Sequence, residues 1–121
     1  KEWGGYEEIS DRLKDRGLGD FVKFYKGNVF ETWVANPTEF DCLLIDICNT
    51  WESIYKIVIE NEFVNSQIKK GTPVFIEGGA PGHPRINQNT LNNFIKRFDK
   101  PPFSFELIYG TRVSLSRLKL L

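Results

Sequence analysis

Two carboxylates stand at the ends of short apolar runs, where their side chains could bind a metal ion or a substrate. Asp46 interrupts the run LLIDIC, and Glu77 directly follows the run PVFI. A buried charge without a partner is costly, so each carboxylate should face a partner, a ligand or water. Together they could hold a hard divalent cation. The alternatives are structural, since Asp46 could cap a helix that begins near Thr50 and Glu77 could be a capping or surface residue.

The only histidine of the chain, His83, follows the second of these runs in the segment APGHPRIN. An imidazole placed there could act as a general base toward a hydroxyl group. The alternative is an exposed histidine in a loop rich in proline and glycine. Arg85 could bind an anionic group or only solvate the same loop. The sequence contains no Ser-His-Asp order and no HExxH, Walker A or EF-hand pattern.

The elements that would position these residues begin with five strand-like runs. Two of them, Asp41–Ile47 and Pro73–Ile76, are apolar runs typical of parallel strands. Phe21–Tyr25 is a further strand candidate, and the three are expected to form the parallel core. The runs FSFELIY (Phe103–Tyr109) and VSLSRLKL (Val113–Leu120) alternate, and a short segment separates them, which predicts an antiparallel hairpin at one edge of the sheet.

Helical patterns alternate with these runs, so the predicted fold class is α/β with helices on the faces of a mixed sheet. Apolar residues recur at helical spacing in three segments, at Tyr6–Arg16, Trp51–Lys70 and Asn89–Phe98, and Val29–Ala35 is expected to form one or two helical turns. The segment Trp51–Lys70 is expected to break near Asn61. Trp33 and Trp51 could stack on a flat ring or pack in the core.

The carboxyl ends of the predicted parallel strands are the expected binding edge of the sheet. Ligands of open α/β sheets bind just outside those ends. Gly27 and Asn28 follow the first predicted strand, Asp46 lies at the end of the second, and Glu77 follows the third. The sequence therefore predicts that these residues converge on one edge.

Length and composition limit the classes of function. The 121 residues suggest a single domain, and 16 basic residues balance 16 acidic ones. This balance argues against a nucleic-acid partner, and no apolar run is long enough to span a bilayer. Cys42 and Cys48 lie in or beside one apolar run and are expected to be buried, reduced thiols, which fits a cytoplasmic protein.

From Phe21 onward, the sequence resembles the C-terminal two-thirds of the class I S-adenosylmethionine-dependent methyltransferases. The segments that carry the resemblance are FVKFYKGNVFETW, FDCLLIDI, IKKGTPVFIEGG and the closing FSFELIYGTRVSLSRLKL. The pair IDICNTWES and FIEGG looks most like the sugar and small-molecule O-methyltransferases.

This resemblance implies a cofactor, a reaction and a set of site residues. S-adenosylmethionine would contact Gly27, Asn28, Val29 and Asp46. Asp46 and Glu77 would hold a divalent cation, with Mg²⁺ the first candidate. Asp46 and His83 would serve catalysis of methyl transfer to a hydroxyl of a small molecule or sugar.

The resemblance also implies a Rossmann-like domain truncated at its N-terminus. The family's first strand, its GxG loop and the acidic residue after its second strand have no counterpart in the sequence, and Tyr6–Arg16 would be the helix after the second strand. Residues 1–121 would then be one partial domain with an exposed sheet edge. The alternative is a non-catalytic α/β module without a cofactor, which binds a second copy through that edge.

Overall fold

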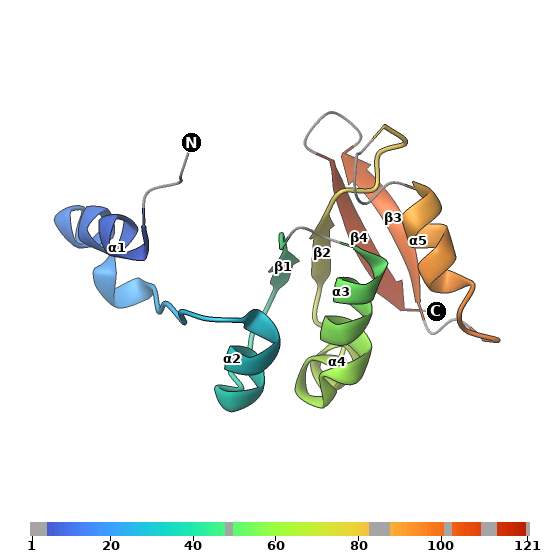
Figure 1. The fold of residues 1–121 in the computed structure, drawn as a ribbon, viewed down its shortest axis with the longest axis horizontal. Helices are drawn as coiled ribbons and strands as arrows, with labels where there is room; N and C mark the ends of the chain where they lie inside the picture. The colour runs from blue at the N-terminus through green and yellow to red at the C-terminus, as the bar shows by residue number, and fades with distance from the viewer. Residues whose placement is uncertain (1–4, 48–49, 83–87, 101–102, 110–113, 121) are drawn as a thin grey trace. The chain divides into compact units, whose positions relative to one another are not determined.

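The computed structural model describes residues 5–47, 50–82, 88–100, 103–109 and 114–120 (Figure 1). The chain forms two compact units, Lys1–Asn36 and Pro37–Leu121. No helix in the described part of the chain is long and apolar enough to cross a membrane.

The first unit contains two α-helices, α1 (Tyr6–Asp15) and α2 (Val29–Ala35). The first was predicted from apolar spacing and the second as one or two helical turns, and both are confirmed. Helix α1 ends where Gly17 takes a positive φ of 72°, a conformation that glycine adopts without steric cost. The ring of Tyr6 packs edge-on against Phe24 at a centroid distance of 5.1 Å.

The predicted strand Phe21–Tyr25 is wrong. Phe21 ends a short 3₁₀ helix, Gly19–Phe21, and the four residues after it have no regular secondary structure. The side chain of Phe21 is 82% exposed. Aromatic and β-branched residues favour a strand only where a neighbouring strand pairs with them. The described residues of this unit contain no such strand.

In the second unit, four described strands form one open mixed sheet. They are β1 (Leu43–Ile45), β2 (Val74–Glu77), β3 (Phe103–Tyr109) and β4 (Leu115–Leu120), in the spatial order β1-β2-β4-β3. β1 and β2 are parallel, and β4 is antiparallel to both β2 and β3. The mixed α/β sheet and its closing antiparallel pair are therefore confirmed, but the described parallel part has two strands where three were predicted.

Strand β1 is shorter and more exposed than the sequence indicated. It covers three residues of the predicted Asp41–Ile47, and Leu44 at its centre is 61% exposed. Cys42 is exposed as well, against the expectation of a buried thiol, while Cys48 lies outside the described residues. The physical reason is that Cys42 and Leu44 alternate with the buried Ile45 and so lie on the face of β1 opposite the described helices α3, α4 and α5 (Figure 1).

The segment between β1 and β2 is helical and broken where expected. Helix α3 (Trp51–Tyr55) continues into a π-helical segment, Lys56–Glu60, and α4 (Glu62–Lys69) follows. Asn61 separates the last two, and its side chain accepts a 3.0 Å hydrogen bond from the Val64 N–H. Asn61 is therefore a helix N-cap.

The hydrophobic core lies between the helices and one face of the sheet. Figure 1 shows α3, α4 and α5 (Gln88–Ile95) on the same side of the strands. Phe94 of α5 is fully buried, and its ring lies 5.5–6.1 Å from four other rings, those of Tyr55, Phe98, Phe103 and Phe105. This aromatic cluster joins two helices to β3.

The opposite face of the sheet carries a mixed row of side chains. Leu44 is in register with Phe75, Phe75 with Arg117, and Arg117 with Glu106. Register partners point to the same face of a sheet, so these four residues share one face. Arg117 and Glu106 are exposed, and the row passes from apolar at β1 to charged at the hairpin.

Candidate functional site

Asp46 and Glu77 directly follow two residues that are paired across the neighbouring strands β1 and β2. Ile45 of β1 is in register with Ile76 of the parallel strand β2. Asp46 comes directly after Ile45, and Glu77 comes directly after Ile76 as the last residue of β2. Adjacent strands lie about 4.8 Å apart, so both residues are at the carboxyl end of the parallel pair. The predicted adjacency of these two strands is confirmed.

The surroundings of the two carboxylates differ. Asp46 is exposed, whereas Glu77 is half-buried and lies opposite Leu115 of β4. Two carboxylates at one sheet end fit an ion such as Mg²⁺, which keeps several of its waters. Within the described ranges, however, no three His, Cys, Asp or Glu residues are grouped so that they could hold a metal ion. A cation bound here would therefore take at most these two described carboxylates and complete its shell with water.

The backbone after Glu77 is held by two serines of the last strand segment. The Gly78 N–H donates to the Ser114 carbonyl at 2.8 Å, and the Ala80 N–H donates to Ser114 Oγ at 3.2 Å. Ser116 Oγ donates to the Gly78 carbonyl at 2.8 Å. Both serines are buried, at 1% and 0% exposure. Buried hydrogen bonds of this kind fix a loop because breaking one leaves a polar group unsatisfied.

The second glycine of this loop is required by its neighbour in β4. Gly79 has a φ of 105°, and a Cβ at this position would collide with Ser116 Oγ. The close approach that glycine permits at this position is therefore to β4. Ser114 and Ser116 were not predicted as functional residues. Their only signal in the sequence is the alternation VSLSRLKL, which places small polar residues at inward positions.

Gly27, Asn28 and Val29 lie in the first unit, at the start of α2. Gly27 has a φ of 135°, and Asn28 is the N-cap of α2, since its Oδ1 accepts a 3.0 Å hydrogen bond from the Phe30 N–H. The strand expected before them is absent. Asn28 therefore has a structural role, and its contact with a cofactor stays a prediction.

The remaining candidates fall into two groups. His83 and Arg85 lie outside the described residues. Trp33 and Trp51 are half-buried, and the guanidinium carbon of Arg97 lies 3.4 Å from the ring centroid of Trp51. One face of Trp51 is therefore occupied by a cation–π contact, and a flat ligand could reach only the other face.

No protein-family model matches this sequence, and neither a curated protein nor a solved structure is significantly similar to it. The second unit is an α/β domain with two carboxylates, Asp46 and Glu77, at the carboxyl end of a parallel strand pair.

Proposed function

We propose that the chain is the C-terminal part of a Rossmann-like methyltransferase that transfers a methyl group from S-adenosylmethionine to a hydroxyl of a small molecule or sugar. The observation that carries this proposal is the register of β1 and β2, which places Asp46 and Glu77 after paired residues at one sheet end. The family that the sequence resembles has its metal-binding carboxylates at these two strand ends.

The architecture around the two carboxylates supports the same proposal. The resemblance implies a parallel pair, a helix after each of its strands, and a closing antiparallel hairpin. Helix α3 follows β1, α5 follows β2, and β4 lies between β2 and β3. Ligands bind outside the carboxyl ends of parallel strands in open α/β sheets, and this is the end at which Asp46 and Glu77 lie.

The chain's own residues would have defined parts in the reaction. Gly27, Asn28, Val29 and Asp46 are the residues proposed to hold S-adenosylmethionine, which would supply the methyl group for an acceptor hydroxyl. His83 is the base proposed to take the proton of that hydroxyl. Asp46 and Glu77 would orient the hydroxyl, directly or through Mg²⁺.

Calorimetric titration with S-adenosylhomocysteine tests this proposal, on this chain and on any longer form of the protein. We expect saturable binding in a form that includes the cofactor-binding strands. Asp46→Asn should weaken it, whereas Asp41→Asn should not, because Asp41 is an exposed carboxylate just before the other end of β1. The absence of binding in every form, or equal weakening by both variants, would contradict the proposal.

A second candidate function is a non-catalytic module that associates with another copy of itself. The observation that favours it is Leu44, which is 61% exposed on the end strand of the sheet. Exposed end strands promote pairing between chains. Sedimentation analysis should then give a dimer that Leu44→Ser dissociates and Val34→Ser does not, since Val34 is equally apolar and 67% exposed in the other unit. A monomer at all concentrations would exclude this function.

A further inference from the structure

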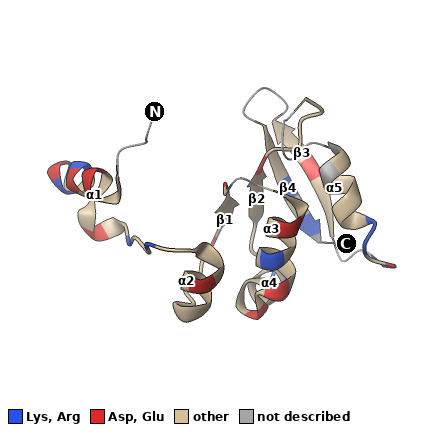
Figure 2. Ribbon diagram, in the orientation of Figure 1, with Lys and Arg blue, Asp and Glu red and all other residues tan. Residues whose placement is uncertain are grey.

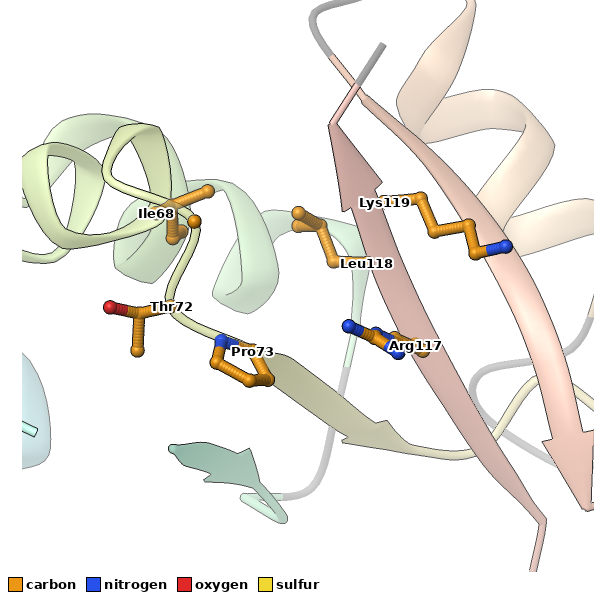
Figure 3. A pocket seen from close by; sticks show the side chains of 7 residues that line it. Ile68, Thr72, Pro73, Arg117, Leu118 and Lys119 are labelled. Atoms are coloured by element: carbon orange, nitrogen blue, oxygen red, sulfur yellow. The ribbon is translucent and has the colours of Figure 1, made fainter. Parts of the chain in front are cut away.

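A hollow of about 420 Å³ lies at the opposite end of β2 from Glu77. It is bounded by the end of α4, the residues that lead into β2, and β4 (Figure 3). Its lining consists of Ile68, Gly71, Thr72, Pro73, Arg117, Leu118 and Lys119.

The register of the strands explains why the hollow is there. β2 begins at Val74, which is paired with Leu118. The residues just before Val74 come from α4 and are not part of β2. The turn between them is made at Gly71, which has a φ of 93° and donates its N–H to the Ile68 carbonyl of α4. Lys119 is therefore paired with β3 but not with β2. The strand β4 extends past the start of β2, and the space beside this extension is the hollow.

The charged residues in the lining are all basic. They are Arg117 and Lys119, and the exposed Lys69 and Lys70 directly precede Gly71. Figure 2 shows basic residues along β4. Glu106 forms a 2.8 Å ion pair with Lys119 and is in register with Arg117. Asp41 precedes β1 at this same end of the sheet, where the Leu43 N–H donates to the Pro73 carbonyl, so the basic character described here is that of the lining itself.

Arg117 is the residue best placed to receive an anion. Its side chain extends from β4 on the side of Pro73 (Figure 3), and its guanidinium carbon lies 5.9 Å from the centroid of the Phe75 ring. Among the described residues it forms no ion pair. A guanidinium group can donate two parallel hydrogen bonds to a phosphate or carboxylate group.

We propose that this hollow binds the phosphate group of a small ligand. Arg117 would form the paired hydrogen bonds. Lys119 is already in a 2.8 Å ion pair with Glu106, so the positive charge offered to the phosphate is that of Arg117. The half-buried Pro73 offers an apolar contact to the body of the ligand that carries the phosphate. The proposal does not depend on the proposed function, because the hollow and the two carboxylates lie at opposite ends of β2.

The test is an NMR titration of the whole chain with inorganic pyrophosphate. The amide signals of Gly71, Thr72 and Lys119 should shift and saturate. Arg117→Gln should weaken binding roughly tenfold or more, because hydrogen bonds to a charged group are lost. Arg117→Lys should weaken it less, since it keeps the charge but loses the planar pair of donors.

Arg16→Gln is the matched control, because it removes the same charge from an exposed arginine in the other unit. It should leave the affinity for pyrophosphate unchanged. Thermal melting of each variant checks that it is folded, and Arg117 is exposed, so its replacement should keep the fold. The proposal is overturned if no signals near Gly71 shift, or if Arg16→Gln weakens binding as much as Arg117→Gln, since the attraction would then be general.

Discussion

Gly79 lies directly against Ser116, which is fully buried in β4. Ser116 Oγ also donates a 2.8 Å hydrogen bond to the carbonyl of the preceding residue, Gly78. The loop that follows Glu77 is thus packed against the last strand through a residue 38 positions further along the chain. This relationship fixes the direction in which the backbone leaves β2, and with it the place where a ligand could meet Glu77.

Replacement of Gly79 should destabilise the protein by more than its backbone conformation alone explains. Gly79→Ala combines an unfavourable φ of 105° with a collision between the new Cβ and Ser116 Oγ, and we expect a loss of about 2–4 kcal/mol. Gly71→Ala has a similar φ of 93° but nothing within 4 Å of its Cβ, so it should lose only about 1 kcal/mol. Urea denaturation measures the free energy of unfolding of both variants. Equal losses would show that the collision with Ser116 does not contribute.

The hydroxyl of Ser116 should contribute more to stability than an exposed serine hydroxyl does. Ser116→Ala leaves the buried Gly78 carbonyl without this donor, at a cost of about 1–3 kcal/mol in the free energy of unfolding. Ser66→Ala is the control, because its hydroxyl donates to the Phe63 carbonyl on an exposed helix, where water can replace it. Thermal or urea unfolding of the two variants would contradict this account if Ser66→Ala were the more destabilising.

The aromatic cluster should dominate the stability of the second unit. Phe94→Ala removes a fully buried ring that contacts four others, and about 3–5 kcal/mol should be lost. Phe21→Ala makes the same change at a side chain that is 82% exposed in the first unit, and its effect should stay within about 0.5 kcal/mol. Circular dichroism during urea titration distinguishes them. A small effect at Phe94 would mean that the core lies elsewhere.

The sequence predicted the elements whose signals are local. Both alternating runs became strands. Burial alternates along β4, where Ser116 and Leu118 are buried and Arg117 and Lys119 are exposed, whereas the last four residues of Phe103–Tyr109 are all exposed. The helix break at Asn61 was also visible, because asparagine is a good N-cap. Phe21–Tyr25 has strand-like residues but no partner strand among the described elements of its unit, and pairing cannot be judged from one run alone.

The candidate site was predictable only in part for the same reason. The end-of-run positions of Asp46 and Glu77 are local signals, and the register of β1 and β2 agrees with their expected adjacency. The hydrogen bonds between the loop after Glu77 and the side chains of Ser114 and Ser116 join residues that are 34 and 38 positions apart in the sequence. The exposure of Cys42 and Leu44 likewise depends on which face of β1 the described helices cover (Figure 1), which the order of elements along the chain does not specify.

Methyl transfer from labelled S-adenosylmethionine by Asp46→Asn and Glu77→Gln variants tests the central claim most directly. The assay uses a form of the protein that is active, with urea unfolding measured in parallel and Asp41→Asn as the control. The account predicts that each site variant lowers turnover at least tenfold, as expected for the loss of a positioning or acid–base group, while its free energy of unfolding changes by less than about 1 kcal/mol. Unchanged turnover in both variants would contradict the claim and leave the two carboxylates with a structural role.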